Sequence, residues 1–83
     1  MAAKAVREDA ATLRARCFDM IMMRGDMTAD ECAALCNKSI LSIRPRFSEM
    51  HTMGMIFKSG VRRKNDSGHS AEVWTIDRQA KLL

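Results

Sequence analysis

Residues 28–54, TADECAALCNKSILSIRPRFSEMHTMG, predict two helices joined by a short turn. The first helix begins at a capping box, in which the Thr28 hydroxyl accepts from the Glu31 amide and the Glu31 carboxylate accepts from the Thr28 amide. This helix is expected to end after two turns, at about Cys36, because Asn37 tolerates the left-handed backbone that turns the chain. Its predicted apolar face consists of Cys32, Leu35 and Cys36, while Ala33 and Ala34 permit the close approach of a neighbour.

The second of these helices contains Pro45 between two arginines near its start. Ser39 and Ser42 are both suitable N-caps. A proline costs little in the first turn of a helix but removes a hydrogen bond and bends the helix further in. We therefore favour Ser42 as the cap, with a loose or 3₁₀ opening near Ser39 and regular helix from about Ser42 to Thr52. The predicted buried stripe is Ile40, Ile43, Phe47, Met50 and Met53.

The flanking segments complete an α+β order of three helices followed by a two-stranded hairpin. Apolar residues at helical spacing predict a helix over about residues 8–24, which Gly25 ends. After Gly54, residues 55–63 and 71–76 are rich in β-branched and aromatic residues and predict two strands. The polar segment KNDSGHS, residues 64–70, supplies the turn between them.

Length and composition predict one small intracellular domain. The 83 residues are 47% hydrophobic and 29% charged, which indicates a globular chain, residues 1–83, with its core over about 8–77 and short flexible termini. The sequence has no apolar run that would span a bilayer, and its start lacks the apolar core of a signal peptide, so a cytoplasmic location is expected. Three cysteines, an odd number, indicate reduced and buried thiols, and their spacing to the two histidines predicts no metal site.

Basic residues are concentrated in one part of the sequence. Residues 1–38 contain six basic and six acidic residues, a net charge of zero. Residues 39–64 contain six basic residues and a single acidic one, Glu49, which gives this segment a charge of +5. A local basic excess indicates a surface for a polyanion.

Two helices joined by a tight turn and followed by a basic hairpin form the layout of a winged helix-turn-helix. In such a protein the second of the two helices, here about residues 42–53, lies in the DNA major groove, and the wing, here residues 58–70, contacts the backbone or the minor groove. Arginine forks bind guanine edges or phosphates, and serines add phosphate contacts. The predicted DNA-binding residues are Ser42, Arg44, Arg46, Ser48, Lys58, Arg62, Arg63, Lys64 and His69.

The stretch from Thr28 to Trp74 also resembles the small winged helix-turn-helix domains common in bacteriophage and prophage genomes. Their pattern joins a T-x-x-E helix start, a V-x-P-R-x-x-x-L recognition helix, a G-L-I strand and a wing with G-x-x-R and S-G-R-x-x-x-V-W. Two departures are Asn37, where glycine is frequent, and His69, where arginine is frequent. The resemblance covers about residues 10–77 and implies a DNA-binding regulator of transcription or replication. The matching residues are Ile43, Pro45, Arg46, Met50, Gly54, Met55, Ile56, Gly60, Arg63, Ser67, Gly68, Val73 and Trp74.

A second class of function competes with DNA binding. Winged helices also act as protein–protein adaptors, and here the basic surface would meet an acidic host protein, or surplus methionines such as Met22, Met23 and Met53 would form an apolar patch. A homodimer would increase the length of DNA read. The sequence has no glycine-rich phosphate loop and no catalytic constellation, so we expect no enzyme activity, small-molecule substrate, membrane contact or cofactor.

Overall fold

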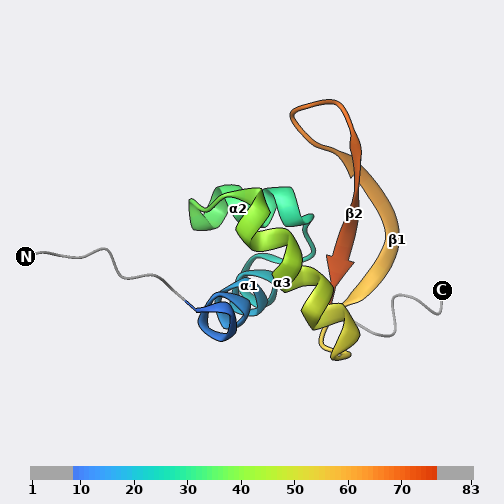
Figure 1. Ribbon diagram of the computed structural model, residues 1–83. Coiled ribbons are helices and arrows are strands. Elements are labelled where there is room, and N and C mark those ends of the chain that lie inside the picture. Colours follow the sequence, from blue (N-terminus) through green and yellow to red (C-terminus); the bar gives the residue numbers. More distant parts are fainter. Residues whose placement is uncertain (1–8, 77–83) are drawn as a thin grey trace, which may run out of the picture.

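The computed structural model describes residues 9–76, which form three helices followed by a two-stranded antiparallel sheet (Figure 1). This order confirms the predicted α+β layout of a winged helix. The predictions for the two termini lie outside the described residues. Within residues 9–76 no helix has the length and apolar character needed to cross a membrane. The elements are α1 (Ala10–Arg24), α2 (Ala29–Cys36), α3 (Ile40–Thr52), β1 (Phe57–Lys64) and β2 (Ser70–Thr75).

The ends of α1 and α2 follow the signals in the sequence. Asp9 caps α1 by accepting from the Thr12 amide at 2.8 Å. The predicted capping box of α2 is confirmed, since the bonds between Thr28 and Glu31 are both 3.0 Å long. Asn37 ends α2 with a φ of 55° and a ψ of 47°, the left-handed conformation expected of it.

The start of α3 differs from the prediction, because Ser39 and not Ser42 is its N-cap. The Ser39 hydroxyl accepts from the Leu41 amide at 3.1 Å, and regular helix begins at Ile40. The Ser42 amide bonds to the Ser39 carbonyl at 3.0 Å, a 3₁₀-type contact, but the predicted loose or 3₁₀ segment before Ser42 is instead part of the α-helix. Pro45 therefore lies in the second turn. The early start places Ile40 in the first turn of the helix, where it packs half-buried against the core one turn before the fully buried Ile43, and this packing offsets the cost of the proline.

The core lies between the three helices and the start of the hairpin, and it contains the three cysteines as free thiols. Two predicted core residues are instead exposed. Leu35 is 43% exposed because it lies about 100° around α2 from the centre of the face that Cys32, Ala33 and Cys36 bury. Met53 is 57% exposed because it follows the last residue of α3. The core residues are Leu13, Cys17, Ile21, Met27, Cys32, Ala33, Cys36, Ile43, Phe47, Met50 and Ile56.

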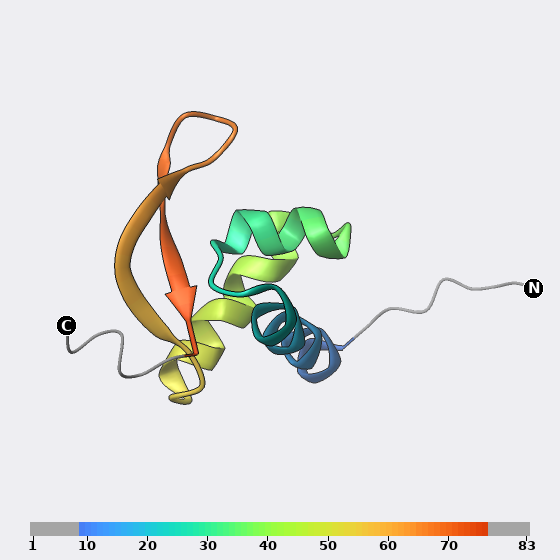
Figure 2. The same ribbon diagram turned by 180° about the vertical axis from the view of Figure 1, so that it is seen from behind.

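The hairpin projects beyond the helices and is attached to them through β2 (Figures 1 and 2). Met27, in the turn between α1 and α2, exchanges two backbone hydrogen bonds with Trp74, of 2.8 and 3.2 Å. The strands lie within two residues of their predicted bounds. A bulge between Lys58 and Arg62 sets three residues of β1 against one of β2, and Gly60, with a φ of 89°, supplies the positive φ there.

Candidate nucleic-acid interface

The side of α3 that faces away from the core carries most of its predicted site residues. Leu41, Arg44, Ser48 and Thr52 recur every three or four residues and are all exposed, so they form one ridge along the helix. The Arg44 side chain is 64% exposed. Ser42 is also exposed, but it precedes Arg46 by one turn and so lies on the Arg46 side of the helix, away from this ridge. A helix of this kind offers polar groups along its length to a partner.

Arg46 lies apart from Arg44, although only one residue separates them. Its Nε and Nη2 donate to the two oxygens of Glu49 at 2.9 and 2.7 Å, and its side chain is only 18% exposed. Glu49 also accepts from Nη1 of Arg14 at 2.8 Å, which ties α3 to α1. Hydrogen bonds from Arg46 and then Arg14 lower the pKa of Glu49. Side chains two residues apart in an α-helix point in directions that differ by about 200°. Arg44 and Arg46 therefore do not act as a pair.

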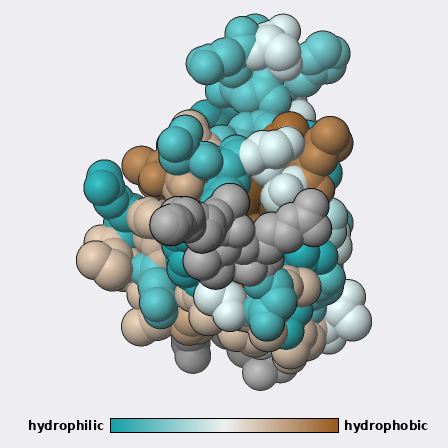
Figure 3. All heavy atoms as spheres, turned by 60° about the vertical axis from the view of Figure 1, so that its left-hand side comes forward, coloured by the Kyte–Doolittle hydropathy of each residue, from teal (hydrophilic) through white to brown (hydrophobic). Residues whose placement is uncertain are grey.

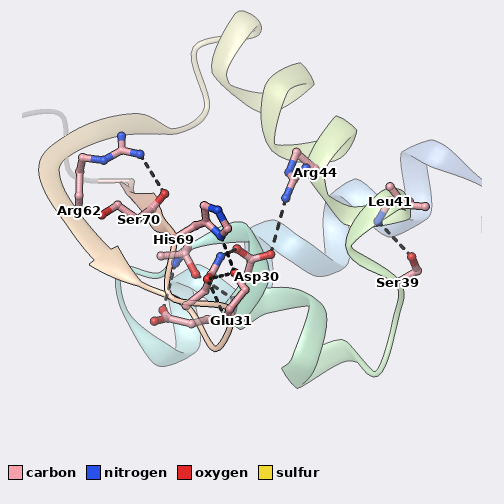
Figure 4. A network of polar contacts seen from close by, with 11 residues as sticks. Asp30, Glu31, Ser39, Leu41, Arg44, Arg62, His69 and Ser70 are labelled. Atoms are coloured by element: carbon pink, nitrogen blue, oxygen red, sulfur yellow. Dashed lines mark hydrogen bonds and ion pairs between the residues drawn. The ribbon is translucent and has the colours of Figure 1, made fainter.

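A groove of about 320 Å³ separates α3 from the hairpin. Arg44 and Ser48 line it from the helix, and His69 and Glu72 line it from the hairpin. Trp74 is half-buried in the groove and makes edge contacts with the rings of Phe47 and His51, at centroid distances of 6.2 and 5.1 Å. Figure 4 shows Arg44 and His69 on opposite sides of this space.

The two arginines of β1 point to opposite faces of the hairpin. Arg62 donates from Nη2 to the Ser70 carbonyl at 3.0 Å, and its Nη1 lies 3.6 Å from a Glu72 oxygen. Arg63 instead reaches α2, where its Nη1 lies 2.7 Å from both oxygens of Glu31. The same Glu31 oxygen that closes the capping box thus also holds the hairpin against α2.

Two lysines of the hairpin remain available to a partner. Lys58 and Lys64 are exposed and make no ion pair with any other residue in the described part of the chain. Figure 3 shows the projecting hairpin at the top of the view as largely hydrophilic, with apolar areas on the body below it. The hairpin therefore presents free positive charge, and Lys64 does so on the side toward α2, where it lines a cavity with Leu35.

The tip of the hairpin is ordered by its own polar contacts. The Ser67 hydroxyl lies 2.6 Å from Oδ1 of Asn65 and 3.0 Å from Nδ1 of His69. The amide of Asn65 bonds to the His69 carbonyl at 2.9 Å, and its side-chain Nδ2 donates to Asp30 of α2 at 2.8 Å. His69 is exposed at the mouth of the groove, consistent with its expected position in the turn.

Sequence reasoning missed the carboxylates that accompany the arginines of residues 39–64. All four of these arginines lie within 4 Å of a carboxylate, namely those of Asp30, Glu31, Glu49 and Glu72. Three of these carboxylates lie outside the segment whose charge is +5. The basic excess is thus largely neutralised in space. Only the three-residue spacing of Arg46 and Glu49 could have been recognised in the sequence.

Comparison with known proteins adds no family to this description. No protein-family model matches the chain, and no curated protein is significantly similar to it. Among residues 9–76, no three His, Cys, Asp or Glu side chains lie together in a group that would hold a metal ion. The class is therefore defined by the fold, a small α+β protein with the layout of a winged helix.

Proposed function

We propose that the protein binds double-stranded DNA, with α3 over about residues 42–53 in the major groove and the hairpin over 58–70 along the backbone or in the minor groove. The observation that carries this proposal is the exposed ridge of Arg44 and Ser48, which stands beside a projecting hairpin with the free Lys58 and Lys64. The major groove admits an α-helix, and a neighbouring hairpin then reaches the phosphates.

The contacts within the protein assign different roles to the predicted site residues. Arg44 is the base-reading residue, and Ser42 and Ser48 donate to phosphates. Lys58 and Lys64 supply charge to the backbone, with Arg62 and His69 near them on the hairpin. Arg46 and Arg63 act indirectly, because each is committed to a bidentate or double contact with a carboxylate.

The resemblance to phage and prophage domains supports a proposal for the biological role. We place the protein in the cytoplasm of a bacterial host, as a regulator of transcription or replication that has no enzyme activity. A homodimer would double the number of base pairs that such a small domain reads.

A salt series with labelled duplex DNA tests this function. Each neutralised phosphate contributes about −0.9 to the slope of log affinity against log salt. If only Lys58, Lys64 and Arg62 contact phosphates, the slope is about −3, whereas all six basic residues of 39–64 would give about −5. Lys58→Ala/Lys64→Ala should make the slope shallower by about 2.

The matched control for charge is Arg16→Ala, which removes an exposed cation from the middle of α1, a helix outside the candidate interface. This variant should bind DNA as the wild type does within about twofold, whereas Arg44→Ala should lose about tenfold or more on a preferred sequence. A wild type that fails to bind duplex DNA at about 50 mM salt, where such binding is strongest, refutes the function.

A specific observation supports the second candidate function, a protein–protein adaptor. Met22, Met23 and Leu41 are 57%, 81% and 78% exposed, and the arginines of α3 and β1 are largely neutralised by carboxylates. An adaptor would bind no duplex DNA and would retain a purified host partner through these apolar side chains. Loss of that partner in Leu41→Asp or Met23→Asp, but not in Lys64→Ala, would favour the adaptor.

A further inference from the structure

Asp30 connects the two parts of the candidate interface. It is the second residue of α2, and its Oδ1 lies 3.8 Å from Nη2 of Arg44 on α3. Its other oxygen accepts from Nδ2 of Asn65 in the hairpin at 2.8 Å. Figure 4 shows Arg44 reaching down from α3 to this carboxylate. One side chain of α2 therefore contacts both the helix and the hairpin that the proposed function assigns to DNA.

The two partners differ in how firmly they are held. The Asp30 side chain is 26% exposed and the Arg44 side chain is 64% exposed. Asp30 is fixed by its bond to Asn65, so its position does not depend on Arg44. Arg44 is long and flexible, and a fixed carboxylate beside its Nη2 restricts the directions in which the rest of the guanidinium can point. The fork still has free N–H groups for a ligand.

The carboxylate also selects the kind of ligand that the guanidinium can meet. A phosphate brought to Arg44 would approach Asp30 as well, and the two negative charges repel each other. The edge of guanine carries two neutral acceptors, O6 and N7, which match the arginine fork. The other base of that pair, cytosine, offers an amino donor that a carboxylate accepts. Arg44 beside Asp30 thus favours a G·C base edge over the DNA backbone.

We propose that Asp30 is a positioning residue that directs Arg44 to a guanine of a G·C base pair, a proposal that rests on the DNA-binding function proposed above. Asp30 then has two effects of opposite sign. It lowers affinity for DNA in general, because it is an acidic group near phosphates. It raises the preference for guanine at one position, because it orients the fork. Asn65 supports this preference from the hairpin without contacting Arg44.

The test begins with selection of a preferred duplex from random sequences by the wild type. Affinity is then measured for that duplex and for copies in which each G·C pair is replaced by A·T in turn. We expect one position at which the wild type prefers guanine by about tenfold or more, and at which Arg44→Ala has no preference. Asp30→Ala should reduce this preference to below about threefold while binding unrelated duplexes about two- to fivefold more tightly.

Three further variants separate positioning from charge and from folding. Asp19→Ala removes a carboxylate from an exposed site on α1, so it should leave the guanine preference unchanged. Asp30→Asn keeps an acceptor for Asn65 but loses the charge, and it reports on the charge if Asp30→Ala fails to fold. Asn65→Ala leaves both charges in place and should reduce the guanine preference by about threefold, since Asp30 then loses its support.

Each outcome bears on one of the two proposals. If Asp30→Ala and Asp30→Asn tighten binding to every duplex with an unchanged guanine preference, the carboxylate only repels phosphate and the positioning role is wrong. If the wild type binds duplex DNA without preference at any position, the positioning role is again wrong, although the DNA-binding function stands. If the wild type binds no duplex at all, the DNA-binding function itself fails, and the positioning role fails with it.

Discussion

Replacing Pro45 with alanine should stabilise the protein. Pro45 is the sixth residue of α3, and it has no N–H to donate to the carbonyl of Leu41. A proline in a helix interior is about 3 kcal/mol less favourable than alanine. The proline also restricts the unfolded chain, and losing this restriction costs up to about 1 kcal/mol. Pro45 is exposed, so the substitution removes little packing, and a net gain of about 2 kcal/mol follows.

Thermal and urea unfolding followed by circular dichroism measure this gain. For a domain of this size, each 1 kcal/mol shifts Tm by about 4–8 °C, so Pro45→Ala should raise Tm by roughly 8–16 °C. Pro45→Gly is the matched control. It restores the N–H but lacks the helix propensity of alanine, so its gain should be about 1 kcal/mol smaller.

An unchanged or lower Tm in Pro45→Ala would refute this reasoning. It would mean that the first two turns of α3 already accommodate the proline, through the 3₁₀-type bond between Ser42 and Ser39 or a similar adjustment. A gain in stability together with weaker binding to DNA would instead indicate that the protein keeps Pro45 for the shape it gives to the exposed ridge.

Three further predictions concern the capping box, acid stability and the thiols. Thr28→Ala should lower the free energy of unfolding by about 1 kcal/mol in urea, and Thr28→Ser should retain most of it. The arginines beside Glu49 lower the pKa of its carboxyl from the ordinary 4.5, so their stabilisation is present above about pH 4.5 and is lost as pH falls through the lower folded value. The Tm of Glu49→Gln should therefore fall less than that of the wild type between about pH 6 and pH 3. A hydrogen bond with Cys17 and burial raise the pKa of Cys32, so iodoacetamide should label this thiol only in denaturant.

The outcomes that contradict these three predictions are equally specific. Unfolding of Thr28→Ala at the wild-type urea concentration would show that water replaces the cap. An equal fall in Tm for Glu49→Gln and the wild type would assign the acid loss to other carboxyls. Labelling of Cys32 faster than global unfolding would show that the region around α2 opens locally.

The order of elements could be predicted because its signals are local. Apolar spacing, the capping box of Thr28 and Glu31 and the left-handed Asn37 all act within a few residues, and the structure follows each of them. The N-cap of α3 could not be predicted in this way. Local rules weigh the cost of Pro45 in the helix, but they omit the packing of Ile40 against the core, which only the assembled protein provides.

The surroundings of the site residues were predictable only in part. Helical spacing placed Ser42, Arg44 and Ser48 on the exposed side of α3, and they are exposed. The partners of the arginines were not predictable, because Arg63 and Glu31 are 32 residues apart in the sequence. A charge count over a window of sequence assumes that neighbours in the chain are neighbours in space. That assumption holds within one helix, where Arg46 pairs with Glu49, and it fails between the hairpin and α2, where Arg63 pairs with Glu31.

The pairing of the arginines gives an order in which a polyanion could recruit them. The exposed fraction of the side chain falls from 64% for Arg44 through 58% for Arg62 and 48% for Arg63 to 18% for Arg46, and the distance to the carboxylate falls from 3.8 and 3.6 Å to 2.7 Å for the last two. Charge-assisted bonds of 2.7 Å are the strongest of these and are broken at the greatest cost. Releasing Arg63 or Arg46 would also leave a carboxylate facing the phosphates.

Any binding of a polyanion at this surface should therefore start at the cations that break no ion pair, or only a weak one, when they bind. Lys58 and Lys64 break no ion pair with another described residue, and Arg44 can keep its 3.8 Å contact with Asp30 while its free N–H groups meet a ligand. Arg46 and Arg63 contribute more by staying where they are, since Glu49 joins α3 to α1 and Glu31 joins the hairpin to α2. The proposed interface thus uses free lysines for affinity, Arg44 beside Asp30 for reading bases, and two firmly paired arginines, Arg46 and Arg63, to hold the neighbouring elements in place.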